Sequence, residues 1–160
     1  MSQAYSGGCQ CGAVRFRVEG EPKRASICHC RMCQKAMGAP FGAFASYPTA
    51  AVIWTRGVRK TFLSSEHVAR GFCADCGTPL TFEAAAAGGD TIALTLCAFD
   101  QPDSIRPTRQ LAPEGRLRWL DDIGDLPTRS AADQAAYTAK YPPVVSRQHP
   151  DHDTDTWPPG

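Results

Sequence analysis

Seven of the eight cysteines in this 160-residue chain fall into three tight clusters, a spacing at which thiolates can share one metal ion. A closed structural zinc site takes four protein ligands, whereas a reactive zinc site often takes three and leaves one coordination position open. The count of seven therefore predicts one zinc that holds the fold and one that does chemistry. The clusters are Cys9-Gln10-Cys11, Cys28-His29-Cys30-Arg31-Met32-Cys33 and Cys73-Ala74-Asp75-Cys76.

The first and third clusters share one form, because in each a pair of cysteines is followed directly by a glycine, Gly12 or Gly77. Glycine permits a positive φ angle there and lets backbone amides turn toward the sulfur atoms. Two such turns facing each other would make a tetrahedral four-thiolate zinc site, worth about 10–16 kcal/mol of apparent folding free energy at neutral pH. The alternative is redox-active or free thiols. We expect the structural zinc on Cys9, Cys11, Cys73 and Cys76.

The middle cluster places the thiolates of Cys28, Cys30 and Cys33 within six residues, with no glycine directly after it. Three thiolates and Zn²⁺ carry a net charge of about −1 and leave a fourth position open for water or a substrate. An open zinc can polarise a carbonyl group or activate a thiol as thiolate, and its affinity for sulfur favours the thiol.

Cys97 could in principle close this second site as a fourth ligand. It stands inside the apolar stretch Leu94–Phe99, where cysteine is usually a buried small hydrophobic residue, and we favour that interpretation. An iron–sulfur cluster on the triplet and Cys97 is a lesser alternative.

Short strands and turns must position these clusters, since glycine (14 residues) and proline (13 residues) are plentiful and strand-like stretches dominate. The most apolar stretch, Thr91–Phe99, predicts a central strand. Val52–Thr55 and Lys60–Leu63 predict a hairpin around Arg56-Gly57. Further strands are expected at Ala13–Val18, Phe41–Tyr47 and Pro79–Phe82, and Ala84–Ala87 is expected to lead into a turn at Gly88-Gly89-Asp90.

Two helices are expected beside these strands. Cys30–Met37 can form about two helical turns that end at Gly38, and Ser130–Tyr141 predicts a longer helix with Ser130 as its N-cap. Residues 1–145 are interpreted as a single zinc-binding domain, and residues 146–160 as a flexible polar tail. The histidines and aspartates of this tail could bind a metal weakly, but a solvated tail is the simpler interpretation.

The bulk composition argues against several classes of function. The net charge is +1 at pH 7 and the basic residues are scattered, so no nucleic-acid partner is predicted. The longest apolar runs are too short to span a bilayer, so no membrane partner is predicted either. Residues Met1–Gly8 lack the features of a secretory signal, so we expect a cytoplasmic protein whose thiols stay reduced and available to metal.

The three cysteine motifs resemble, in order and in spacing, those of the glutathione-dependent formaldehyde-activating enzyme family. Gln34 departs from the pattern, because many relatives carry a basic residue there. The resemblance implies an all-β zinc-binding fold of the β-tent kind, with antiparallel sheets clipped by the four-cysteine zinc and with short helices. The matching stretches are Gly7–Phe16, Cys28–Lys35, Gly38–Phe41 and Arg70–Leu80, with a looser likeness to about Pro127.

The family's named activity joins formaldehyde reversibly to the glutathione thiol, as a carbon–sulfur lyase. The resemblance therefore implies two zinc ions per chain, glutathione or a similar thiol and formaldehyde as partners, and a catalytic zinc on Cys28, Cys30 and Cys33. His29 is the nearest titratable group and the first candidate for a proton carrier. The alternative is that His29 points away and bonds only backbone.

Other residues near the motifs could bind the substrate. Arg31, Lys35 and Arg70 are candidate anchors for the two carboxylates of the thiol, with ordinary surface charge as the alternative. Phe41 and Phe44 could form the walls of the pocket, although such residues more often belong to the core.

Two rival functions stay open. The same open zinc could process another thiol adduct, or the chain could be a non-catalytic zinc-binding β-domain that binds a partner through its sheet. A fourth protein ligand at the second zinc would favour the non-catalytic domain. The sequence does not predict the oligomeric state.

Overall fold

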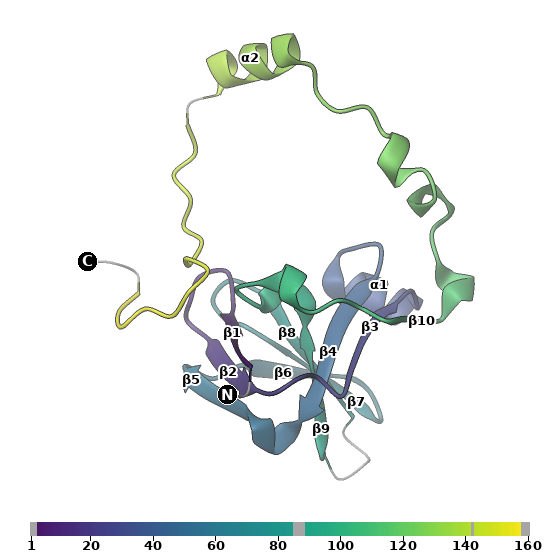
Figure 1. Ribbon diagram of the computed structural model, residues 1–160, viewed down its shortest axis with the longest axis vertical. Coiled ribbons are helices and arrows are strands. Elements are labelled where there is room, and N and C mark those ends of the chain that lie inside the picture. Colours follow the sequence, from purple (N-terminus) through teal and green to yellow (C-terminus); the bar gives the residue numbers. More distant parts are fainter. Residues whose placement is uncertain (1–2, 85–88, 142, 158–160) are drawn as a thin grey trace.

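The computed structural model describes residues 3–84, 89–141 and 143–157, which build two β-sheets and two α-helices. One sheet has the antiparallel strand order β1-β2-β5, and the other has the order β10-β3-β4-β9-β8-β7-β6 (Figure 1). The mainly β fold predicted from the sequence is therefore confirmed. The strands are β1 Ala4–Gly8, β2 Arg15–Glu19, β3 Arg24–Cys28, β4 Gly42–Pro48, β5 Val52–Arg56, β6 Lys60–Ser65, β7 Val68–Phe72, β8 Pro79–Ala84, β9 Thr91–Thr95 and β10 Arg109–Leu111.

Both predicted helices are present. Helix α1 (Arg31–Met37) begins after its N-cap Cys30 and ends at Gly38, whose φ of 59° is the left-handed conformation that glycine adopts freely. Helix α2 (Ala131–Lys140) begins after Ser130, whose hydroxyl accepts a hydrogen bond from the Asp133 amide at 3.1 Å. Short 3₁₀ helices lie at Thr49–Ala51, Leu96–Ala98, Pro102–Ser104, Pro113–Gly115, Arg118–Leu120 and Ile123–Asp125.

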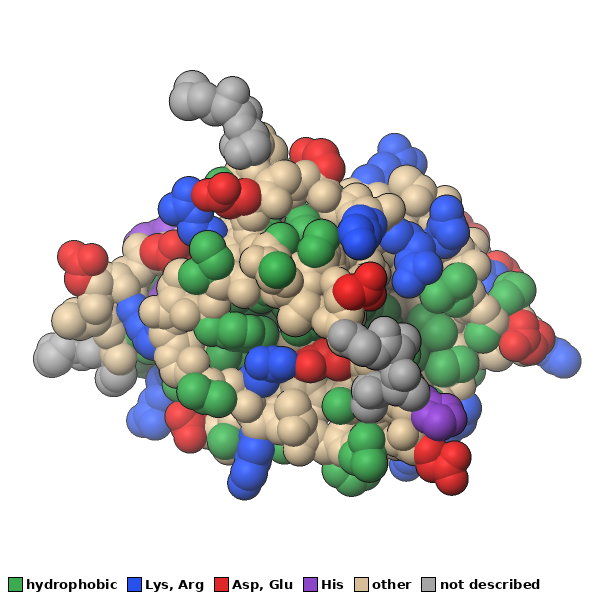
Figure 2. Space-filling view, turned by 90° about the horizontal axis from the view of Figure 1, so that it is seen from below, with side chains coloured by type: hydrophobic (Ala, Val, Ile, Leu, Met, Phe, Trp, Pro, Cys, Tyr) green, Lys and Arg blue, Asp and Glu red, His purple; other side chains and the backbone are tan. Residues whose placement is uncertain are grey.

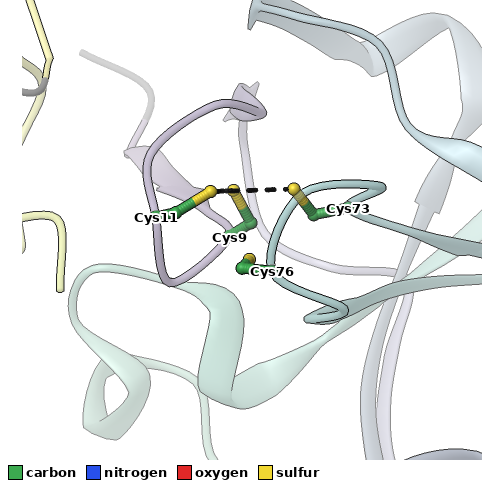
Figure 3. Close-up of side chains that lie close together, drawn as sticks. All are labelled: Cys9, Cys11, Cys73 and Cys76. Carbon is green, nitrogen blue, oxygen red and sulfur yellow. Dashed lines mark hydrogen bonds between the residues drawn. The ribbon is translucent and has the colours of Figure 1, made fainter. Parts of the chain in front are cut away.

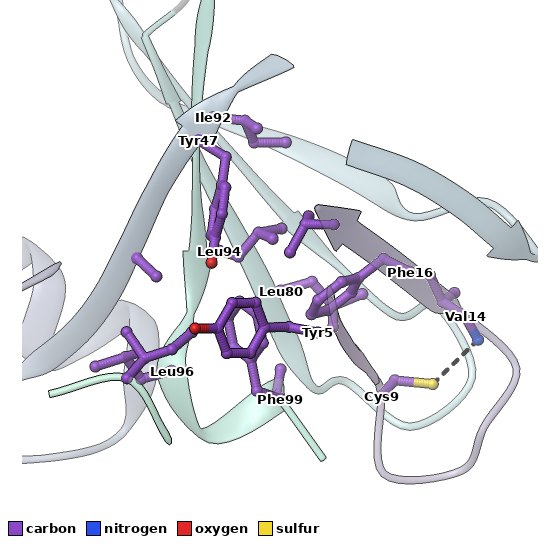
Figure 4. Close-up of a cluster of buried hydrophobic side chains, with 14 of the residues drawn as sticks. Tyr5, Cys9, Val14, Phe16, Tyr47, Leu80, Ile92, Leu94, Leu96 and Phe99 are labelled. Atoms are coloured by element: carbon purple, nitrogen blue, oxygen red, sulfur yellow. Dashed lines mark hydrogen bonds between the residues drawn. The ribbon is translucent and has the colours of Figure 1, made fainter. Parts of the chain in front are cut away.

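The hydrophobic core joins the two sheets (Figure 4). In β2, Phe16 and Val18 are completely buried while Arg17 and Glu19 are exposed, as the alternation in the sequence predicts. The Phe16 ring packs edge-to-face on Phe99, with 5.1 Å between ring centroids. The largest fully buried side chains from the other sheet are Tyr47, Leu80, Ile92 and Leu94.

Strand β9 lies between β4 and β8, so the prediction of a central strand is confirmed, but the strand ends at Thr95. The chain continues as the 3₁₀ helix Leu96–Ala98, which buries Leu96 and Ala98 and exposes Cys97. The expectation of a buried Cys97 inside a strand is therefore wrong. A 3₁₀ turn replaces the two-residue period of a strand, and the middle residue faces solvent.

The predicted hairpin of Val52–Thr55 and Lys60–Leu63 is also wrong. Strand β5 pairs with β2 in the small sheet, and β6 pairs with β7 at the edge of the large sheet. Gly57, with φ of 61°, lies in the connection that carries the chain from one sheet to the other. The expected bridge at Ala84–Ala87 falls mostly outside the described residues.

Strand β10 pairs parallel with β3, whereas the family resemblance implied antiparallel sheets. Every other pair of strands is antiparallel among the described residues. This parallel pairing brings residues 109–111 alongside the strand that ends in the middle cysteine cluster. It therefore places a late segment of the chain beside the triplet.

After β10 the chain leaves the sheets, and α2 lies apart from them with no buried residue (Figure 1). The chain then returns to the β1–β2 loop, where the amide of His149 donates a 2.7 Å hydrogen bond to the carbonyl of Gln10. His149 is only 3% exposed, which differs from the expected solvated tail.

Charged side chains of both signs are interspersed over the face shown in Figure 2, with no continuous basic stripe. No helix within the described ranges is long and apolar enough to cross a membrane.

Candidate metal centres

Four sulfur atoms from two distant loops converge on one point (Figure 3). Cys9 and Cys11 lie in the loop between β1 and β2, and Cys73 and Cys76 lie in the loop between β7 and β8. The Sγ atoms of Cys9 and Cys11 are 3.6 Å apart, and those of Cys11 and Cys73 are 3.8 Å apart. A tetrahedral zinc at about 2.3 Å from each sulfur requires sulfur–sulfur distances of about 3.8 Å. The donor set therefore fits zinc.

The two cysteine loops have the same backbone hydrogen bonds. In each loop the amide of the first cysteine donates to the carbonyl five residues later, at 2.9 Å for Cys9 to Val14 and 3.0 Å for Cys73 to Thr78. The glycine after each pair has a positive φ, 75° at Gly12 and 76° at Gly77. The predicted role of these glycines is thus confirmed: an L residue would strain each turn.

Hydrogen bonds also reach the sulfur atoms. The Val14 amide donates to Cys9 Sγ at 3.2 Å, and the Thr78 hydroxyl lies 3.1 Å from Cys76 Sγ. Burial raises the pKa of Cys9 to about 12. Burial also acts to raise the pKa of Cys76, but hydrogen bonds from Thr78 outweigh it and lower that pKa to about 6. Metal ligation requires thiolates, so binding at this set displaces the proton of the buried Cys9 thiol.

The middle cluster is built at the junction of β3 and α1. Cys28 ends β3, Cys30 caps α1, and Cys33 lies in the first turn of that helix. Their sulfur atoms lie within 4.8 Å of one another, and no fourth histidine, cysteine or carboxylate joins them within the part of the chain that the structure describes. Exposed Cys97 is not part of either cluster.

The start of helix α1 and its neighbours affect the pKa values of the Cys30 and Cys33 thiols. The Cys33 amide points at Cys30 Sγ at 3.4 Å. Burial acts to raise the pKa of Cys30, but hydrogen bonds from this amide and from the other two cysteines lower it. Burial raises the pKa of Cys33 to about 12, and the side chain of Arg70 opposes that rise.

Among the three candidate anchors, only Arg70 meets the triplet. Its Nη2 donates to Cys33 Sγ at 3.6 Å, and the residue is 7% exposed. Arg31 and Lys35 are exposed on α1. A buried cation against a sulfur favours the thiolate form. Three thiolates with a neighbouring guanidinium suit a zinc centre of net charge about −1.

His29 is 2% exposed and its ring is held on two sides. Its Nε2 lies 2.8 Å from Gln110 Oε1 on β10, and its ring packs edge-to-face against Phe41. Its Nδ1 is buried and has no hydrogen-bond partner among the described residues. The alternative in which His29 bonds only backbone is therefore wrong.

Of the two phenylalanines that could form pocket walls, Phe41 lines a cavity of about 680 Å³ together with His29. Phe44 is 5% exposed and belongs to the core.

Sequence reasoning missed Gln110 and gave no structural role to Gln34. Gln34 is buried, and its Nε2 donates to the carbonyl of Gly115 at 2.9 Å, which attaches the Pro113–Gly115 turn to α1. The sequence marked Gln34 in two ways, as a polar residue inside the predicted helix and as a departure from the family pattern. Gln110 had no signal, because its position depends on the parallel pairing of β10 with β3.

The glutathione-dependent formaldehyde-activating enzyme family model matches residues 4–113. A Schizosaccharomyces pombe protein described as an uncharacterized lyase is 36% identical over 78 residues, which cover 49% of this chain and 56% of that protein. The chain thus spans about half the length of this curated relative. A solved Rhodobacter sphaeroides structure is 18% identical, with a TM-score of 0.50 over 66% of this chain and 98% of that one. That likeness concerns the fold alone. With more than half its residues matched, the chain belongs to the glutathione-dependent formaldehyde-activating enzyme family.

Proposed function

We propose that this protein adds formaldehyde reversibly to the thiol of glutathione or a similar small thiol, as a carbon–sulfur lyase. The site would be a zinc ion held by Cys28, Cys30 and Cys33, with a second, structural zinc held by the four-cysteine set. The observation that carries the proposal is the three-sulfur group without a fourth described ligand, in a chain of this family. A cytoplasmic location, where thiols stay reduced, is part of the proposal.

The reaction is balanced without an oxidant or reductant. One sulfur–carbon bond forms, the π electron pair of the aldehyde moves to its oxygen, and the thiol proton ends on that oxygen. Zinc held by three thiolates supplies a Lewis acid with an open position, which polarises a carbonyl group and lowers the pKa of a thiol. The protein must therefore position two small reactants and move one proton.

His29 is the residue proposed to move that proton. With Oε1 of Gln110 against Nε2, the neutral imidazole carries its proton on Nε2, which leaves Nδ1 as the acceptor. Phe41 and Gln110 restrict the ring, so the acceptor atom has a fixed direction. Nδ1 would take the thiol proton and return it to the aldehyde oxygen, which requires the buried Nδ1 to become accessible when the substrate binds. Arg70 places a positive charge beside the triplet, at Cys33 Sγ.

The test is the rate of adduct formation, measured by exchange NMR on zinc-loaded protein with glutathione and formaldehyde. We expect exchange faster than in buffer, loss of that acceleration in Cys30→Ser, and full acceleration in Cys97→Ser. His29→Gln should reduce the rate by about 10²-fold, the usual contribution of a positioned proton carrier. Equal exchange with wild type and with Cys30→Ser would overturn the proposal.

A further inference from the structure

Residues 110–115, which we call the clasp, lie against both elements that carry the three-cysteine cluster. On one side the clasp includes the end of β10, which pairs parallel with β3 and places Leu111 beside Cys28. The carbonyl of Leu111 accepts a 3.0 Å hydrogen bond from the amide of His29. The clasp therefore holds the end of β3, where the first cysteine of the cluster lies.

On the other side the clasp is bonded to helix α1. This helix has only seven residues, and a helix of that length is marginal in water without tertiary contacts. Its two buried residues are Cys33 and Gln34. The Gln34 side chain uses its Nε2 to donate a 2.9 Å hydrogen bond to the carbonyl of Gly115. The clasp thus holds the helix at the turn that carries the third cysteine.

The backbone of the clasp also fits closely on the cluster. A Cβ at Gly115 would lie 2.6 Å from the carbonyl oxygen of His29, so only glycine permits this approach. Ala112, with φ of 51°, is the one non-glycine residue of positive φ in the described ranges. Such a conformation is unfavourable for an L residue and persists only where surrounding contacts impose it. The clasp is therefore held in this shape by its neighbours.

We propose that the clasp is a positioning element for zinc, which sets the distance between the sulfur atoms of the three-cysteine cluster. Cys28 ends β3 and Cys33 lies in α1, so their separation depends on how these two elements are held together. Groups that orient metal ligands typically change metal affinity by about 10–100-fold when they are removed. Gln34 is then a positioning residue. That this zinc is catalytic rests on the proposed function, whereas the positioning of the sulfur atoms does not.

The test is the zinc affinity of the full chain, measured by competition with a chromogenic chelator. Cys30→Ser identifies the zinc of the three-cysteine cluster, because that variant should lack it. Gly115→Ala should weaken binding of this zinc at least tenfold and leave the other zinc unchanged. Gly124→Ala is the matched control, since a Cβ there meets nothing within 4 Å, and it should bind both zinc ions as wild type does. Equal affinities in Gly115→Ala and Gly124→Ala would overturn the proposal.

A second variant keeps the test valid where Gly115→Ala does not fold. Gln34→Met keeps the length of the side chain but removes the donor, and should also weaken this zinc at least tenfold. Tyr5→Phe, which removes the 2.8 Å hydrogen bond to Glu21 beside the other sheet, should not. Wild-type affinity in Gln34→Met would reject the role of the clasp.

A spectroscopic measurement separates positioning from a general loss of stability. In the chain loaded with Co²⁺, the visible absorption that Cys30→Ser lacks reports the geometry of the three-cysteine cluster. Gln34→Met should alter this absorption, and an unaltered spectrum would contradict the proposal. These measurements contain no thiol and no formaldehyde. Weakened zinc in the variants with no adduct formation by wild type would reject only the proposed function; adduct formation with unweakened zinc would reject only the clasp.

Discussion

Cys11 and Cys73 are 62 positions apart in the sequence, yet their sulfur atoms lie 3.8 Å apart. Cys11 follows a strand of the three-stranded sheet, and Cys73 follows a strand of the seven-stranded sheet. A metal ion at this point would tie the two sheets together. The triplet, in contrast, comes from one stretch of six residues between β3 and α1. Loss of a metal there would disconnect no distant parts of the chain.

This contrast predicts different results for two serine variants. Cys76→Ser removes a ligand that joins the sheets, and a structural zinc contributes about 10–16 kcal/mol, as much as the whole stability of a domain. We expect this variant to be unfolded by circular dichroism. Cys30→Ser should lose one zinc per chain by metal analysis and remain folded.

Cys97→Ser is the matched control, because Cys97 is exposed and lies outside both clusters. It should keep both zinc ions and the wild-type unfolding curve. If Cys30→Ser and Cys76→Ser lose metal and structure to the same extent, the division between a structural and a reactive site is wrong.

Asp100 should stabilise the fold through Arg15. Two hydrogen bonds of 2.7 and 2.6 Å join the buried pair. Burial acts to raise the pKa of Asp100, but the hydrogen bonds from Arg15 and Ser6 outweigh it and lower that pKa. Asp100→Asn removes one of the two carboxylates that contact the buried Arg15, and Asp153 remains at 2.6 Å from Nη2, so urea unfolding at pH 7 should show a loss of about 1.5–3 kcal/mol.

Because the pKa of Asp100 is lowered in the folded protein, its contribution to stability decreases at low pH. Stability from Asp100 is present above the pKa of about 3.9 in the unfolded chain and is lost as pH falls through the lower folded value. The gap between wild type and Asp100→Asn should therefore stay constant from pH 8 to pH 7, a range above the lowered pKa of His149, whose charge interacts with Asp100. A gap that varies in this range would contradict the assignment. Asp153→Asn should cost less than about 1 kcal/mol, because Asp153 is 53% exposed.

Alanine variants of Gly12 and Gly20 can test how the C-terminal segment around His149 is held against the β1–β2 loop. Both have a positive φ, 75° and 81°, so alanine at either should cost about 1–2 kcal/mol in backbone strain. A Cβ at Gly12 would also collide with the His149 ring, whereas one at Gly20 meets nothing within 4 Å. Gly12→Ala should therefore release the segment and speed trypsin cleavage after Arg147, and Gly20→Ala should not.

The double variant Gly12→Ala, His149→Ala separates strain from collision. Removing the ring already releases the segment, so adding Gly12→Ala to His149→Ala should change cleavage little. Equal cleavage rates for Gly12→Ala and Gly20→Ala would show that the collision has no effect on this segment.

Alkylation should distinguish Cys97 from the other cysteines. If both clusters hold zinc, seven thiols are ligands, and only the exposed Cys97 is open to iodoacetamide. Mass spectrometry should show one label per native chain, none in Cys97→Ser, and more after chelation of zinc. Several labels on the native, zinc-loaded chain would contradict the two-zinc assignment.

The local features of this protein could be predicted from its sequence. The glycines after the first and third cysteine pairs have positive φ, α1 ends at Gly38, and α2 begins after Ser130, as the sequence indicates. These features depend on residues only a few positions apart. Because a tight turn or a cap requires particular residue types at fixed spacing, the sequence pattern contains the information needed.

What the sequence determined was the cysteine clusters, the glycine turns after two of them and the helices; the tertiary structure decided which distant segments meet. Strands β5 and β6 are neighbours in the chain but belong to different sheets, and β10 pairs parallel with β3. The same long-range packing places Arg70 against Cys33 and Gln110 against His29. No local pattern records these contacts, because they follow from how the sheets bury their common core and from the pairing of strands far apart in the chain.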